Sequence, residues 1–176
     1  MVEATKVEKV GEFVIGYPIP FSAVFSDRKS VRRGHAFVEL YRVPVGGREV
    51  YAAVVTSSPK ILKEKGVNEG GSSLVNGIEH FASFFHMVLE NEGISVRPED
   101  LFFIEYEPDE GNVPQSLDLC VMQPVMVFLP NGTKYWDYTR SMPDWFILWE
   151  ASSINEKVSI EKILQERLPE VVRNLR

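Results

Sequence analysis

The residues whose types and spacing could do chemistry gather around one histidine. Glu79 and His80 are adjacent, and Asn76 precedes them by about one helical turn. A carboxylate beside an imidazole can orient a water, hold a metal ion or transfer a proton near neutral pH. The metal motif His-Glu-x-x-His is absent, and a buried polar network that holds a helix to a loop is the competing interpretation. We therefore treat His80 and Glu79 as catalytic candidates.

A second set of carboxylates comes from two apolar segments. Glu105 and Glu107 share one face of a predicted strand over residues 101–108, and Asp118 alternates with leucines in the strand that follows. A carboxylate in an apolar strand needs a partner or the edge of a cleft, although charged residues also protect sheet edges from aggregation. If the strand lies beside the helix that carries His80, Glu105 could meet the imidazole. Glu105 is therefore the third catalytic candidate.

The segment before His80 has the chemistry of an anion site. Two glycines at 70–71 lead into Ser72 and Ser73, and free amides at a helix N-terminus are a natural seat for an anion or a carboxylate. The stretch matches neither a phosphate-binding Walker loop nor a dinucleotide fingerprint. We predict Ser72, Ser73 and Asn76 as ligand-binding residues for a small polar or anionic ligand.

A helix must position these groups. Apolar residues recur at spacings of three and four from Ser73 to about residue 92, and Gly93 is suited to a left-handed stop. The opposite face carries polar residues, with His86 at its margin. Gly77 is a poor helix former that costs about 1 kcal/mol relative to alanine, and such a cost is tolerated where another part of the chain or a ligand approaches closely.

Strand patterns surround this helix. Residues 13–20 contain two prolines and predict an edge strand, whereas 35–43 and 49–56 flank a glycine turn and predict a hairpin. Residues 57–71 read as a loop with one helical turn near 61–63. Residues 101–108, 117–122 and 125–129 predict further strands of an antiparallel sheet, with one possible parallel pair across the helix.

The last third of the chain is less clear from its pattern. Residues 144–150 fit either a strand or one helical turn, and 159–168 predict a second helix that Pro169 kinks or ends. The predicted fold class is α+β: a mostly antiparallel sheet packed against one long helix, with a second C-terminal helix, in a single domain over residues 1–176.

Composition narrows the classes of function. The chain has a net charge of −6, but residues 67–150 hold fourteen acidic against three basic residues. Such an acidic middle disfavours nucleic-acid binding, which depends on lysine and arginine. Cys120 is the only cysteine, so no disulfide can form within one chain, and we interpret it as a small core residue. With no membrane-length apolar run and no signal-like start, a cytoplasmic protein is expected.

The spacing of several motifs resembles a group of small uncharacterised bacterial proteins. The shared features are a helix start of the form G-[ST]-S-x-x-N-x-x-E-H, found here at residues 71–80, an I-E-x-x-P strand at 104–108 and a strand with Asp118 before leucine. This sequence has Tyr106 and Glu107 where the group has His-Tyr, and a leucine at 117 where it has an aromatic residue. The resemblance has no activity attached, so it selects the same polar residues without naming a reaction.

Two hypotheses follow. The first is a ligand-binding protein with a polar pocket formed by Asn76, Glu79, His80 and Glu105, acting in a hydrolase-like way with His80 as the proton-transfer group. The alternative is a non-catalytic interaction or accessory protein, of the kind encoded on mobile elements, whose acidic middle docks a basic protein partner. The first requires His80 near a carboxylate in a concave site, and the second requires an exposed acidic or aromatic patch. Metal, cofactor, substrate and homo-oligomer formation stay open.

Overall fold

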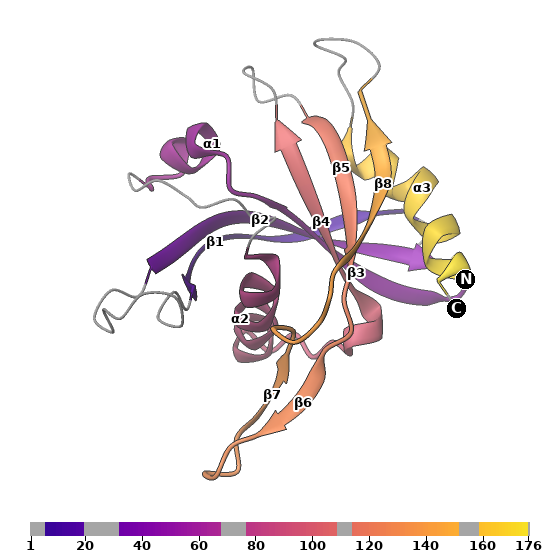
Figure 1. Ribbon diagram of the computed structural model, residues 1–176. Coiled ribbons are helices and arrows are strands. Elements are labelled where there is room, and N and C mark those ends of the chain that lie inside the picture. Colours follow the sequence, from indigo (N-terminus) through magenta and orange to yellow (C-terminus); the bar gives the residue numbers. More distant parts are fainter. Residues whose placement is uncertain (1–5, 20–31, 68–76, 109–113, 152–158, 176) are drawn as a thin grey trace.

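A six-stranded sheet forms the centre of the computed structural model, which describes residues 6–19, 32–67, 77–108, 114–151 and 159–175. The strands lie in the order β1-β2-β3-β4-β5-β8 (Figure 1). Only β3 and β4 pair in parallel, and the other neighbours are antiparallel. The antiparallel-dominated α+β class is therefore confirmed. The strand bounds are β1 Glu8–Ile19, β2 Arg32–Val45, β3 Arg48–Thr56, β4 Leu101–Pro108, β5 Pro114–Val121 and β8 Asp144–Glu150.

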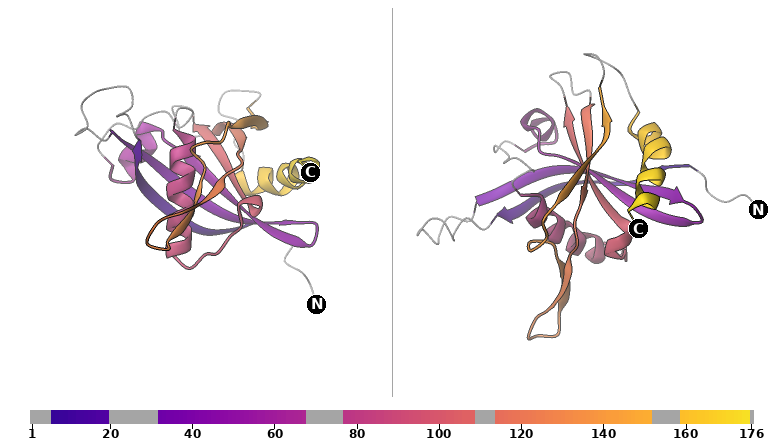
Figure 2. Two further views of the ribbon diagram at one scale, coloured as in Figure 1. Left: turned by 60° about the horizontal axis from the view of Figure 1, so that its bottom comes forward. Right: turned by 45° about the vertical axis from the view of Figure 1, so that its right-hand side comes forward.

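Helices cover both faces of this sheet, as Figure 2 shows. Helix α2, Ile78–Asn91, packs on one face, and α1, Pro59–Glu64, and α3, Ile160–Asn174, pack on the other. The expectation of one long helix is too narrow, because α3 has 15 residues and α2 has 14. A short 3-10 turn, η2 (Pro98–Asp100), leads into β4. No helix in the described ranges is both long and apolar enough to span a bilayer.

The local patterns explain most of these elements. Gly46 and Gly47 have φ values of 51° and 84°, a left-handed backbone that closes the predicted β2-β3 hairpin without strain. The segment between β3 and β4 contains α1 and α2, so the parallel pair does form across the helix. Residues 144–150 form a strand, not a helical turn.

Helix α2 begins later than the sequence predicts. Its N-cap is Gly77, with φ of −143°, and its first residue is Ile78. Glycine thus stands outside the helix interior, so the expected cost of a glycine within the helix does not arise. The predicted end is confirmed, because Gly93 follows the last turn with φ of 84°. The predicted ligand residues Ser72, Ser73 and Asn76 lie outside the described residues.

Helix α3 continues through the proline that we expected to end or kink it. Ser159 is the N-cap and accepts a hydrogen bond from the Lys162 amide. Pro169 lies inside the helix, which extends to Asn174. Leu168 and Val172, on either side of the proline, are buried against the sheet. This apolar packing explains why the helix continues despite one missing backbone donor.

The prediction that residues 125–129 extend the main sheet is wrong, because they belong to a separate hairpin. Strands β6, Val125–Phe128, and β7, Lys134–Asp137, pair only with each other and do not extend the main sheet. The hairpin projects from the sheet, and β7 runs beside α2 (Figure 1). Just after β7, the Tyr138 amide donates to Ser83 Oγ at 2.7 Å. Part of the polar face of α2 is therefore covered by protein.

Candidate functional site

The described candidates lie where the start of α2 meets the middle of β4. Glu79 and His80 are in the first turn of α2, and both side chains are half-buried. Glu105 is near the middle of β4 and is only 4% exposed. Phe103, two residues earlier in β4, packs edge-on against Phe81 of α2. Because side chains alternate along a strand, Glu105 is on the same face of the sheet as α2.

One row of residues across the sheet shows how this face opens toward solvent. The register places Glu105 beside Val55 of β3 and Asp118 of β5, and Asp118 beside Ile147 of β8. Val55 is fully buried, Glu105 is nearly so, Asp118 is half-buried and Ile147 is 69% exposed. On this face, the sheet is therefore covered by other parts of the protein at β4 and exposed to solvent at β8. Two carboxylates occupy neighbouring positions at that boundary.

Electrostatics link the helix and the strands at this place. Burial raises the pKa of the Cys120 thiol to about 12, and the negative charges of Glu79, Glu105 and Asp144 add to the rise. Acidic groups from α2, β4 and β8 thus act on one buried atom of β5. The thiol stays protonated at neutral pH, which supports the interpretation of Cys120 as a core residue rather than a nucleophile.

His80 follows Glu79 in the first turn of α2, but it is not bonded to this group in the described part of the chain. The structure records no hydrogen bond or ion pair between the His80 imidazole and another described side chain. Within the same residues, no set of three or more histidine, cysteine, aspartate or glutamate side chains is placed to hold a metal ion. The side chain of Glu107 is outside the described part. The structure thus brings Glu79 and Glu105 to one region without joining His80 to either.

The other histidine of α2 is in a different environment, which sequence reasoning missed. His86 is 1% exposed, its Nε2 lies 2.8 Å from the Val96 carbonyl oxygen, and its Nδ1 lies 2.9 Å from the Tyr138 hydroxyl. Since a carbonyl can only accept, Nε2 carries the proton and Nδ1 accepts from the tyrosine. Burial lowers the pKa of His86, against a smaller opposing effect of the Val96 carbonyl. Fifty-two residues separate His86 from Tyr138, so no local spacing could have revealed this pair.

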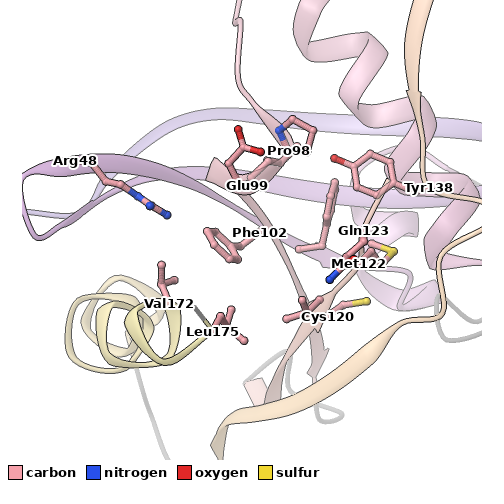
Figure 3. Close-up of a pocket in the computed structure, with 13 residues that line it drawn as sticks. Arg48, Pro98, Glu99, Phe102, Cys120, Met122, Gln123, Tyr138, Val172 and Leu175 are labelled. Atoms are coloured by element: carbon pink, nitrogen blue, oxygen red, sulfur yellow. The ribbon is translucent and has the colours of Figure 1, made fainter. Parts of the chain in front are cut away.

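A cleft of about 200 Å³ lies elsewhere, where β4 begins and β5 ends (Figure 3). Its wall includes the apolar residues Phe102, Val172 and Leu175, and its polar members include Arg48, Glu99 and Gln123. None of Glu79, His80 and Glu105 lines it. The predicted polar pocket is therefore distinct from this cleft.

Comparison with protein-family models, with curated proteins and with solved structures gives no match. The geometry of the chain itself is the basis for the functional proposals below.

Proposed function

We propose that this protein binds a small polar ligand, rich in hydrogen-bond donors, between the first turn of α2 and the β4-β5 pair. Glu105 and Glu79 accept hydrogen bonds from the ligand, and His80 exchanges a proton with it. The observation that carries the proposal is the burial of Glu105, a carboxylate only 4% exposed in a row of residues that opens to the surface at β8.

The charges around Glu105 indicate the chemistry of the ligand. Asp118 brings a second carboxylate to the position directly opposite Glu105 on β5, and a group of carboxylates attracts hydrogen-bond donors and positive charge. Glu79 adds a third from α2, since its charge and that of Glu105 both raise the pKa of Cys120. These groups favour a neutral donor or a cation over an anion. The expected anion seat at Ser72 and Ser73 depends on residues outside the described part.

The proposal also assigns a proton-transfer role to His80. The imidazole is half-buried and follows Glu79 directly in the first turn of α2. A histidine side chain placed against a substrate can act as a general acid or base. A hydrolase-like activity requires a bound substrate to bring the imidazole into reach of the reacting atom, so binding is tested before turnover.

The experiment compares ligand classes and matched variants. Thermal unfolding is measured with small amines, amino sugars and amino-acid amides, and with acetate and phosphate as anionic counterparts. We expect a donor-rich compound to raise the melting temperature of the wild type, and Glu105→Gln or Glu79→Gln to weaken its binding at least tenfold, a loss of about 1.4 kcal/mol. His80→Gln keeps binding and loses turnover where the ligand is hydrolysable.

Glu92→Gln is the control, because Glu92 is exposed at the other end of the same helix. Equal binding by the wild type, Glu105→Gln and Glu92→Gln would contradict the site. Stabilisation by phosphate alone would contradict the ligand class. Circular dichroism on each variant separates loss of binding from loss of fold.

A further inference from the structure

The outer edge of β8 is apolar and exposed on both of its faces. Trp145 is 37% exposed, Phe146 is 43% exposed and Ile147 is 69% exposed. Because consecutive residues in a strand point to opposite faces, these three residues are exposed on both faces of the sheet. The next residue, Leu148, is buried in the same apolar cluster as α3. In the described residues, β8 is the last strand of the sheet and pairs only with β5.

The opposite edge of the same sheet is built differently. Strand β1 has a register shift between Lys9 and Gly11, and Lys9 forms an ion pair with Glu39 of β2 at 2.7 Å. A proline at position 18 removes one backbone donor near its end. Bulges, lysines and prolines are the devices that prevent an edge strand from pairing with another chain. Strand β8 has no lysine or proline, and its register shift against β5 lies at Leu148, just beyond the three exposed apolar residues. The stretch from Trp145 to Ile147 is therefore a regular edge that is suited to pairing.

We propose that β8 accepts an extended segment of a partner protein as an added strand, and that this segment has an apolar centre with lysine or arginine at both ends. The backbone edge of β8 supplies the hydrogen bonds, and Trp145, Phe146 and Ile147 supply apolar contacts on alternate faces.

The acidic residues at both ends of β8 favour basic residues at both ends of the partner segment. Asp144 and Glu150, the first and last residues of β8, are both exposed. In the part of the chain that the structure describes, neither forms a salt bridge. Asp118 of β5, which is opposite Ile147, adds a negative charge on the α2 face. Opposite charges directly across a strand pair stabilise it, and complementary charges also increase the rate of encounter.

The same charges disfavour a second copy of this chain as the occupant. Antiparallel pairing of β8 with itself about a two-fold axis through Ile147 would place Asp144 opposite Glu150 of the other copy at both ends. Like charges directly opposite each other destabilise a strand pair, and a two-fold interface repeats every such contact. A basic-flanked segment meets no such repulsion.

The test uses the full chain and two fluorescently labelled peptides. One peptide is Lys-Val-Thr-Val-Thr-Val-Lys, and the other has glutamate in place of both lysines. Fluorescence anisotropy at low salt is expected to show binding of the lysine peptide about tenfold tighter than the glutamate peptide, a preference that shrinks at high salt. The double variant D144K/E150K inverts the preference, whereas E166K/E170K, exposed on α3, leaves it unchanged.

Each remaining outcome decides against the proposal. Equal binding of both peptides, or a preference that D144K/E150K leaves in place, would overturn the charge assignment. Failure of both peptides to bind would overturn strand addition. Concentration-dependent dimerisation in sedimentation that Ile147→Asp abolishes would assign the edge to a second copy. Glu105→Gln does not alter peptide binding, so failure of the small-ligand site and failure of this edge are distinguishable.

Discussion

The two histidines of α2, six positions apart, show opposite solutions to placing an imidazole in a protein. His86 is sealed beneath the β6-β7 hairpin with both ring nitrogens in hydrogen bonds, and its ring stacks on Trp136 with centroids 6.4 Å apart. His80 is half-buried in the first turn, and the structure records no hydrogen bond or ion pair between its ring and a described residue. One histidine is committed to structure, and the other is the residue to which we assign proton transfer in the proposed site.

The difference comes from what covers the helix. The segment after β7 lies over the middle of α2, where the Tyr138 amide bonds Ser83 and its hydroxyl bonds His86. Tyr138 also packs edge-on against Phe103 of β4, so it joins the hairpin, the helix and the sheet. The start of α2 lies outside this contact, and Glu79 there acts together with Glu105 of β4 on the Cys120 thiol. The same helix therefore has one half whose polar side chains bond to the rest of the protein and one half for which we propose ligand binding.

The largest effect expected from this comparison is on stability. His86→Ala removes two buried hydrogen bonds and leaves the Tyr138 hydroxyl and the Val96 carbonyl without their partner. Because each buried group left unsatisfied costs about 1–3 kcal/mol, the free energy of unfolding should fall by about 2–4 kcal/mol. His80→Ala should change it by less than about 0.5 kcal/mol. Urea unfolding of both variants measures the two values.

A double-mutant cycle tests whether the His86 effect runs through Tyr138. Tyr138→Phe alone should cost about 1–2 kcal/mol, and the double variant should cost less than the sum of the two single changes, because each removes the same bond. Equal losses for His86→Ala and His80→Ala would refute the division of α2 into two halves.

The next effect is a dependence of stability on pH. Burial lowers the pKa of His86 in the folded state below the value of about 6.5 expected in the unfolded chain. The unfolded state then binds more protons as pH falls through 6.5, so stability decreases toward acid by up to about 1.4 kcal/mol per pH unit until the folded pKa is reached. Above about pH 7.5 both states are neutral and His86 adds no slope.

Urea unfolding between pH 7.5 and 5.5 measures this dependence. The wild type and His80→Ala should share the slope, and His86→Ala should lose the part that His86 contributes. A slope that survives in His86→Ala would show that other groups cause it.

Much of the fold follows from local pattern. The β2-β3 hairpin, the end of α2 at Gly93 and the strand around Glu105 depend on residue alternation, glycine turns and apolar spacing, all of which are visible in a short window. The errors have tertiary causes. Helix α3 continues through Pro169 because the apolar residues around it are buried. Strand β6 pairs with β7 beside α2 and is not part of the main sheet.

The site divides in the same way. Glu105 could be selected from the sequence because a carboxylate stands out in an apolar strand, and Glu79 because it is adjacent to His80. The structure places both near Cys120. The contrast between His80 and His86 was not predictable, since both were assigned near one polar helix face and only the distant Tyr138 separates them. The exposed edge at 145–147 was equally hidden, because an apolar run reads as core until the strand order is known.

The smallest effect uses Cys120 as a reporter of charge at the start of α2. With a pKa raised to about 12, its thiol should react with iodoacetamide at pH 8 about a thousandfold more slowly than in the unfolded chain. Glu79→Gln and Glu105→Gln each remove a negative charge that raises this pKa, so each should speed alkylation by roughly two- to tenfold. Mass spectrometry of the alkylated fraction over time gives the rates, with Glu92→Gln as the unchanged control. If Glu79→Gln and Glu92→Gln react at the same rate, the acidic cluster does not extend from the sheet to α2, and the proposed ligand site loses its electrostatic support.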